Sequence, residues 1–419
     1  MIYLLIFLFF FLLVALFRVP VFLAMMAGAV ITILVAGLKL QIIGPSMFNG
    51  SSAFVFLAIP AFMCAGELMS HGGISSAILS LTGVMLQRFR GTLGSVVIVT
   101  SMLFGTITGS SLATIAAVGG MTIPEMLKTG YSKEYTTALV AAAGFLGILI
   151  PPSIPGVIYA VTANQSVAAV WLATLVPGLI LGGLYIIANY IIFGRKQKKI
   201  DEPFKVNIYL SQVAKVLPKA TIAMLVPVVI FVGVYGGIFT PTEAGAASVL
   251  VGAVIAWGIY PKFFKVHPNE TWYNIAAKAA MGSAGIMMII AVAHIVSVMM
   301  AYAGIAAQMV DFVLSVTDNP IIFLIMVNLM LLLVGMFLEI NTSILLFAPI
   351  LIPMAQVYGI NPIHFAAIVL LNLNIGMITP PFAVNLFAAC KLTGVPMNRV
   401  IKPLLPFLAC CIVTLILVT

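Results

Sequence analysis

The chain contains 419 residues, of which 63% are hydrophobic and 7% are charged, and its formal net charge is +9. Soluble domains carry about 25% charged residues, so this composition excludes a water-soluble protein of this length. The positive charge does not indicate nucleic acid as a partner, because in a membrane protein Lys and Arg are informative through their positions along the chain.

The chain has room for roughly a dozen membrane-crossing helices, since each crossing needs about 20 apolar residues. The first apolar segment, 1–17, has no basic start and no small-residue cleavage site, which predicts a retained helix rather than a removed signal. We expect an all-α polytopic fold with five parts in chain order: scaffold helices (1–90); a hairpin, a broken helix at 151–155 and a closing helix (91–194); a basic cytoplasmic linker (195–219); a second set of scaffold helices (220–319); and a second hairpin, a broken helix at 379–385 and the last helix (320–419).

The basic residues predict how the helices cross the membrane. If the N-terminus lies outside, 18 of the 19 Lys and Arg residues fall on the cytoplasmic side, and Lys39 is the exception. This distribution follows the positive-inside rule. It requires two re-entrant hairpins, one with its tip near Gly109 that enters from inside and one with its tip near Glu339 that enters from outside. Both chain termini then lie outside. The alternative is that the crossings have been fitted to the charges.

The two halves of the chain carry an internal repeat with an offset of 229 residues. The matching positions are mostly Pro and Gly, namely Pro124 with Pro353, Gly130 with Gly359, Gly147 with Gly376, Pro151-Pro152 with Pro380-Pro381, and Pro177 with Pro406. Both copies therefore break their helices at the same places. Because an odd number of predicted crossings separates them, the copies are expected to be inverted. Inverted repeats with broken helices are typical of secondary transporters.

Each half also carries a polar island followed by a Pro-Pro break. The islands are 105–114 and 339–343, and the breaks are 151–155 and 379–385. Unwound backbone at membrane depth is tolerated only where it is buried in protein or lines a cavity. Carbonyl and hydroxyl oxygens suit an alkali cation. The helices that begin after the breaks direct positive dipole ends toward the same region, which favours an anionic substrate. The simpler alternative is that each Pro-Pro pair only kinks a helix.

Five titratable residues stand out within apolar segments. Glu339 lies at the second tip, where a role in the site and a structural hydrogen bond are both open. Glu243 follows a threonine that can cap a helix. Glu67 has a histidine four residues later, which favours a pair on one helix face. For His294 and His364, a hydrogen bond in the core is favoured over a proton relay.

The sequence contains no pattern that indicates an enzyme. There is no plausible Ser-His-Asp spacing, no Gly-rich phosphate loop and no clustered His and Cys, so neither catalysis nor an organic cofactor is expected. The four cysteines lie in apolar runs and are interpreted as core or lipid-facing residues. A carrier that works alone, a channel and a membrane-embedded enzyme remain the alternatives to a multi-component transporter.

Three stretches resemble a known family. They are Gly130–Ala138, Ile150–Ser153 and Phe239–Ala246, and they look like the large membrane subunit of tripartite ATP-independent periplasmic (TRAP) transporters. The resemblance implies an elevator fold of the ion-transporter type in the bacterial inner membrane, and import of an organic acid driven by a sodium gradient. It also implies two partners, a periplasmic substrate-binding protein and a small four-helix membrane subunit. Since the chain starts at Met1 without that subunit, a separate partner is expected.

The resemblance also assigns the polar islands and breaks to sites. Two sodium sites are expected, one at Ser110, Ser111, Thr114, Gly147 and Ser153, and the other at Asn341, Thr342, Ser343, Gly376, Thr379 and Asn385. The substrate is expected between the tips, at Thr108, Gly109, Ser111, Pro152, Glu339, Asn341 and Pro381. The family carries several organic acids, and sialic acid or a C4-dicarboxylate is expected here.

Overall fold

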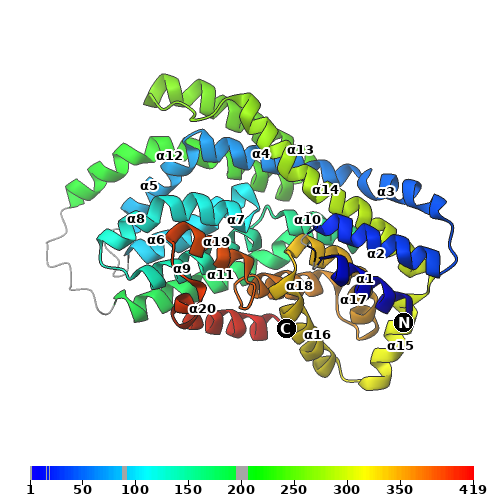
Figure 1. Ribbon diagram of the computed structural model, residues 1–419. Coiled ribbons are helices and arrows are strands. Elements are labelled where there is room, and N and C mark those ends of the chain that lie inside the picture. Colours follow the sequence, from blue (N-terminus) through cyan, green and yellow to red (C-terminus); the bar gives the residue numbers. More distant parts are fainter. Residues whose placement is uncertain (1, 16, 18, 87–91, 195–205) are drawn as a thin grey trace.

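The computed structural model describes the whole chain apart from residues 1, 16, 18, 87–91 and 195–205, and within that part the regular structure is entirely helical (Figure 1). The first half contains α1 (Ile2–Ala15), α2 (Val21–Val35), η1 (Leu40–Ile42), α3 (Ile43–Ser51), η2 (Phe54–Leu57), α4 (Ala58–His71), α5 (Ile74–Leu86), α6 (Thr92–Thr108), α7 (Ser111–Thr114), η3 (Ile115–Gly119), α8 (Gly120–Lys128), α9 (Lys133–Leu149), α10 (Ile154–Thr162) and α11 (Val167–Ile192). The second half contains α12 (Val206–Tyr235), α13 (Pro241–Ala253), η5 (Val254–Phe264), α14 (Trp272–Tyr302), α15 (Ile305–Val316), α16 (Pro320–Phe337), α17 (Ile340–Val357), α18 (Pro362–Gly376), α19 (Val384–Thr393) and α20 (Met397–Val418).

Many of these helices are long enough to cross a bilayer. Among the described residues, eight helices have the length and apolarity of a membrane span, and α9 with α10, bent by 46° at their break, make a ninth if they count as one. Large apolar side chains such as Leu250, Met281 and Ile416 are about 70% exposed on these helices. Such exposure is stable only in lipid or against a partner. The all-helical membrane fold expected from composition is therefore confirmed.

The internal repeat is visible in the helix boundaries. Shifted by 229 residues, the segment 111–128, which contains α7, η3 and α8, coincides with α17, and α6 ends where α16 ends. The starts of α9 and α18 also coincide, and α10 and α11 fall within one residue of the starts of α19 and α20. The prolines and glycines that predicted the repeat thus mark real helix ends. The opposite orientation of the two copies in the membrane stays a prediction.

The helices form two packed groups. In one group α14 packs against α2, α3 and α4, while α13 packs on α4 and α12 packs on α5. In the other, α6 packs on α9, α16 packs on α18, and α11 and α20 fill the space beside them. In Figure 1, α3, α4 and α12 lie along one edge, and α16 and α20 lie along the opposite edge. The packing of α5 and α4 on α6, of α4 on α10 and of α14 on α17 joins the groups.

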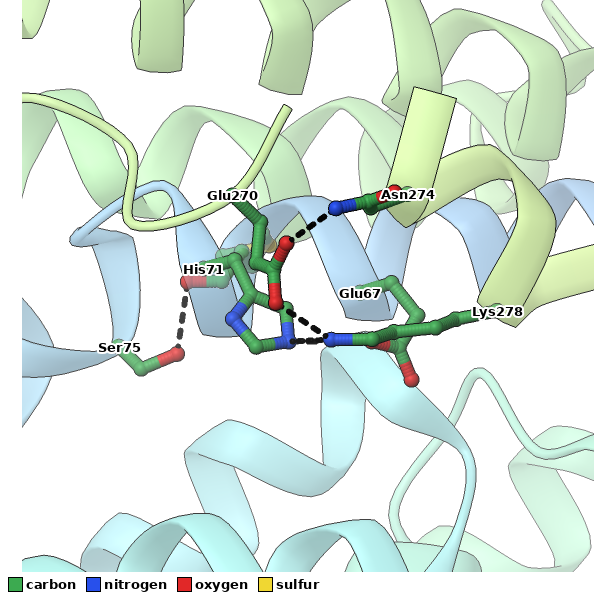
Figure 2. A network of polar contacts seen from close by, with 7 residues as sticks. Glu67, His71, Ser75, Glu270, Asn274 and Lys278 are labelled. Carbon is green, nitrogen blue, oxygen red and sulfur yellow. Dashed lines mark hydrogen bonds and ion pairs between the residues drawn. The ribbon is translucent and has the colours of Figure 1, made fainter. Parts of the chain in front are cut away.

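A polar network holds α4 to α14 at the end of the first group (Figure 2). Lys278 Nζ lies 3.0 Å from Glu270 Oε1 and 3.4 Å from His71 Nε2, which in turn lies 3.4 Å from Glu67 Oε2. Asn274 Nδ2 donates to the other Glu270 oxygen at 2.8 Å. The network fixes the ends of two helices that form a wall of the cavities described below. It also shows the pair of Glu67 with His71 on one helix face, as expected.

The predicted basic linker lies partly outside the described residues. Nothing is described for 195–205, whereas 206–219 form the first turns of α12. In the same half, Thr240 and Glu243 form a reciprocal capping box at the start of α13. The structural role expected for Glu243 is therefore confirmed. His364 also makes a hydrogen bond, since its Nε2 lies 2.6 Å from the Val418 carbonyl, but the residue is exposed rather than in the core as expected.

Candidate functional site

Two pairs of helices cross through glycines and so bring each tip beside a break. A methyl group on Gly105 of α6 would overlap the backbone of Gly147 of α9. In the second half, a methyl group on Gly376 of α18 would overlap the backbone of Gly335 of α16. Only glycine permits such a close approach of two helix backbones. Because α6 and α16 lead into the tips while α9 and α18 lead into the breaks, the crossings set the depth of the site.

The first tip is a tight turn between α6 and α7. Gly109 takes a left-handed conformation with φ +55°, and a methyl group there would meet Pro152 and Ile154 of the first break. Ser110 caps α7 through its side chain, and Thr114 Oγ1 donates to the Ser110 carbonyl at 2.8 Å. Thr108 Oγ1 lies 3.3 Å from Thr114 Oγ1. Three of the four hydroxyl groups predicted for the first sodium site, those of Ser110, Ser111 and Thr114, thus lie at this turn, whereas Ser153 lies in the first break.

The second tip is capped by a carboxylate. Glu339 Oε2 accepts hydrogen bonds from the backbone N–H groups of Asn341, at 2.9 Å, and Thr342, at 3.4 Å, and Oε1 accepts from the Asn341 side chain at 2.8 Å. Ser343 Oγ donates to the Glu339 carbonyl at 3.0 Å. A carboxylate at a helix N-terminus is stabilised by the helix dipole and by these donors. Glu339 therefore makes structural hydrogen bonds that cap α17, which is one of the two roles considered for it from the sequence.

The two breaks differ in detail. Pro151-Pro152 and Pro380-Pro381 both contain a cis peptide bond. After the first break, Ser153 caps α10, and its carbonyl accepts from Trp171 Nε1 at 3.1 Å. After the second break, the backbone N–H of Asn385 donates to the Met377 carbonyl at 3.0 Å, which ties the two half-helices together. Thr379 Oγ1 donates to the Ile375 carbonyl at 2.7 Å, so this hydroxyl is partly engaged.

Both tips line one small cavity, called the tip cavity below. Its volume is about 70 Å³, and it is lined by Met63, Gly109, Ser110, Ser111, Leu112, Ile148, Ile154, Pro155, Ile286, Glu339, Ile340, Asn341 and Met377. Four of the seven residues predicted to bind substrate lie there, namely Gly109, Ser111, Glu339 and Asn341. Thr108, Pro152 and Pro381 do not line it. Met63 of α4 and Ile286 of α14 close it from the first helix group, and neither residue stands out in the sequence.

Several oxygen atoms near the second tip are buried without a hydrogen bond. They are Asn341 Oδ1 and Thr342 Oγ1 at the tip, and Asn372 Oδ1 and Asn374 Oδ1 on α18 just before the break. A buried acceptor that lacks a partner costs about 1–3 kcal/mol. Hard oxygen donors of this kind fit a sodium ion, so the residues present suit the predicted cation. No cluster of His, Cys, Asp or Glu suited to another metal occurs in the part of the chain that the structure describes.

The site thus combines two helix tips, two broken helices and buried oxygen atoms without hydrogen-bond partners, inside a shell of exposed apolar side chains. This arrangement defines a membrane transport protein built from two structural repeats. Residues 7–419 match the family described as "Tripartite ATP-independent periplasmic transporter, DctM component". The chain belongs to this family, as the three sequence stretches predicted.

Similar proteins agree with this assignment. The C4-dicarboxylate TRAP transporter large permease protein DctM of Vibrio cholerae is 37% identical over 91% of this chain and 87% of its own length. The isethionate TRAP transporter permease protein DctMQ of Oleidesulfovibrio alaskensis is 34% identical over 96% of this chain, which spans 62% of that relative. The sialic acid TRAP transporter large permease protein SiaM of Vibrio cholerae is 31% identical over 89% of this chain and 85% of its length.

Solved structures share the fold. The YdaH transporter of Alcanivorax borkumensis matches with a TM-score of 0.63 and 13% identity, over 90% of this chain and 88% of that one. MtrF of Neisseria gonorrhoeae matches with a TM-score of 0.58 and 13% identity, over 93% of this chain and 83% of the MtrF chain. At this identity the likeness concerns the arrangement of helices alone.

Proposed function

We propose that this chain is the transport core of a sodium-coupled importer of a small organic acid in the bacterial inner membrane. One observation carries the proposal: Ser111 at the first tip and Asn341 at the second line the same cavity, although they lie 230 positions apart in the chain. A transporter of the repeat type needs its substrate at the interface of the two copies.

The buried oxygens support the sodium coupling. The first cation site is assigned to the turn at Ser110, Ser111 and Thr114 with the adjacent break, and the second to Thr342 with the α18 end at Asn374. A cation at either position stabilises the backbone of a tip. When bound, it also supplies positive charge beside the cavity and offsets the Glu339 carboxylate, which otherwise repels an acid.

The substrates for which similar proteins are named favour a small acid. Relatives named for C4-dicarboxylates and for isethionate are at least as similar to this chain as the one named for sialic acid. We therefore assign a substrate of the C4-dicarboxylate class rather than sialic acid, and the cavity donors Ser111 and Asn341 suit a carboxylate.

The transport cycle is assigned to the two helix groups. The second group, which carries both tips and both breaks, slides as a body against the first group, in the manner of an elevator. A periplasmic binding protein delivers the acid, and a small four-helix membrane subunit covers exposed apolar surface of the first group, such as Phe48 and Met288, which line an open groove of about 610 Å³. Both chain termini are assigned to the periplasmic side.

Uptake into proteoliposomes tests the proposal. The complex is reconstituted with its small subunit, and radiolabelled succinate or sialic acid is offered with the binding protein under an inward sodium gradient. The expected result is accumulation of succinate that potassium cannot support.

Uptake that is unchanged when potassium replaces sodium overturns the coupling. Uptake without any binding protein favours a carrier that works alone, and flux that never exceeds equilibrium favours a channel. Accumulation of sialic acid alone overturns the substrate class.

A further inference from the structure

A second, larger cavity lies beside the tip cavity and has no place in the function described so far. This side cavity has a volume of about 400 Å³ and is lined by Asn49, Gly50, Ala53, Phe56, Val161, Thr162, Asn164, Ile290, Ala293, His294, Ser297, Leu345 and Pro349. Its walls come from α3, η2 and α14 of the first helix group and from α10 and α17 of the second. It therefore lies between the two groups rather than inside either.

The two cavities follow each other along the same three helices. The lining residues pass from Ile286 to Ile290 on α14, from Asn341 to Leu345 on α17, and from Pro155 to Val161 on α10. A helix rises 1.5 Å per residue, so these steps correspond to about 6–9 Å. The side cavity is thus the next position along one track, about the length of a small acid away from the tips.

The track has a direction. On α14 it leads from Lys278, near the helix start, toward His294 and Ser297 in the half that ends at Tyr302. The basic residues place the start of α14 in the cytoplasm under the positive-inside rule. The side cavity then lies toward the periplasm, where the binding protein delivers its ligand.

The residues that line the side cavity suit an anion that keeps part of its hydration shell. None of the residues that line the cavity is Asp or Glu, whereas Asn49, Asn164, Thr162, Ser297 and His294 offer hydrogen-bond donors. The tip cavity, by contrast, holds the Glu339 carboxylate and is much smaller. An acid is therefore not repelled in the side cavity and need not lose its whole hydration shell there.

The His294 side chain, which lines the side cavity, packs against Gly50 of α3. A methyl group on Gly50 of α3 would overlap the His294 side chain, so the imidazole packs directly on the glycine backbone. Its position is fixed by the crossing of α3 and α14, and the ring is partly exposed toward the cavity. The sequence favoured a core hydrogen bond for this residue, but no side-chain bond from His294 is among those the structure describes.

We infer that the side cavity is an entry site, a second and looser binding position where the organic anion rests against His294 before it moves to the tip cavity. The inference rests on the proposed direction of transport. It adds a residue of the first helix group, which does not travel with the substrate, to the recognition of the acid.

Labelling with small charged thiol reagents tests the entry site without knowledge of the substrate. In a background with Cys64, Cys390, Cys410 and Cys411 replaced by alanine, Ser297→Cys and Thr162→Cys are treated from outside in intact cells. The reagents are the anionic 2-sulfonatoethyl and the cationic 2-trimethylammonioethyl methanethiosulfonates. The matched control is Ser166→Cys, an exposed position just beyond α10 that does not line the cavity. We expect the rate of the anionic reagent relative to that of the cationic one to be at least tenfold higher at both cavity cysteines than at the control.

Two substitutions of His294, each made in the Ser297→Cys variant, test whether its side chain recognises the anion. His294→Leu removes the donor and is expected to slow the anionic reagent several-fold more than the cationic one, while His294→Gln keeps a donor and restores the rate. Equal ratios of the anionic to the cationic rate at the cavity and control cysteines overturn the entry site. An equal slowing of both reagents by His294→Leu overturns the role of His294. If the alanine background does not fold, the parent chain with its native cysteines supplies the baseline. Since labelling needs no sodium gradient, its failure is distinct from a failure of succinate uptake.

Discussion

Ser111 Oγ donates a hydrogen bond of 2.8 Å to Asn385 Oδ1, and this bond joins the first tip to the second broken helix. The two residues are 274 positions apart, and both side chains are buried. The packing around them has the same character, because α19 packs on η3 and α7 while α10 packs on α17. The helix that follows each break therefore packs against the hairpin of the other half, so the two half-sites form one structural unit.

The first prediction follows from this bond. Ser111→Ala leaves Asn385 without its partner, and a buried polar group that loses its hydrogen bond costs about 1–3 kcal/mol. We expect Ser111→Ala and Asn385→Ala each to lower the melting temperature in detergent and to reduce sodium-driven uptake. The double variant should lose clearly less than the sum of the two, because coupled residues are not additive.

The control for this cycle is Ser80→Ala. Ser80 Oγ donates only to the carbonyl of Ser76 on its own exposed helix face, so its loss should have little effect. Fully additive effects of Ser111→Ala and Asn385→Ala would show that the two halves do not act through this bond.

The second prediction concerns the glycine crossings. Gly105→Ala forces α6 away from α9, because the added methyl group meets backbone that cannot rotate aside. Overpacking costs about 1–3 kcal/mol and more when backbone must shift. We expect a large fall in the melting temperature or loss of folded protein for Gly105→Ala and for Gly376→Ala.

A matched control lies on α11. A methyl group on Gly183 meets nothing within 4 Å, so Gly183→Ala should be neutral or slightly stabilising, since Ala is the better helix former by up to about 1 kcal/mol. A Gly105→Ala protein as stable as Gly183→Ala would refute the close crossing. Thermal unfolding followed by size-exclusion fluorescence measures all three.

The repeat and the tips were predictable because they depend on helix breaks. Pro124 and Pro353, or Pro151-Pro152 and Pro380-Pro381, carry local backbone constraints that are the same in any fold. The polar run at Gly109 was equally visible against its apolar surroundings. These local signals located both half-sites before any contact between them was known.

The remaining site residues carry little or no local signal. Asn372 and Asn374 interrupt an apolar run just before the second break, and only the burial of their Oδ1 atoms without hydrogen-bond partners marks them as part of the site. Met63 and Ile286 are ordinary apolar residues, and they line the tip cavity because α4 and α14 pack beside it. Contacts between elements far apart in the chain depend on packing rather than on composition. The partner choice of Ser111, on the opposite half, is hidden for the same reason.

The third prediction concerns pH and the network of Figure 2. Hydrogen bonds from Asn274 and Lys278, together with the Lys278 charge, hold the pKa of Glu270 below its ordinary value of 4.5. A carboxylate whose pKa is lower in the folded state stabilises that state at neutral pH, and this contribution is lost as the pH falls through the lowered pKa. We expect the melting temperature to fall below pH 4.5, and Glu270→Gln to remove part of that dependence while lowering stability at neutral pH.

The control for the network is Glu125→Gln. Glu125 and Lys128 form an exposed pair on α8 at 3.1 Å, and exposed pairs contribute about 0–1 kcal/mol. Its substitution should leave the acid branch of the curve unchanged. An acid branch in Glu270→Gln identical to that of the parent chain would show that another group controls it.

The fourth prediction separates the hydroxyl of Thr342 from its shape. Thr342 is 1% exposed, and its Oγ1 has no hydrogen-bond partner, whereas its backbone N–H is held by Glu339. Thr342→Val keeps the volume and removes the oxygen, and Thr342→Ser keeps the oxygen and removes a methyl group. If Oγ1 holds the cation, Thr342→Val should raise the sodium concentration for half-maximal uptake about tenfold, equivalent to about 1.4 kcal/mol, and Thr342→Ser should raise it much less.

Because an unpaired buried hydroxyl is costly, Thr342→Val should also be at least as stable as the parent chain without sodium. A Thr342→Val protein that sodium stabilises less than it stabilises the parent chain at the same concentration would place a cation at this oxygen. Equal stabilisation of both proteins by sodium would remove Thr342 from the site.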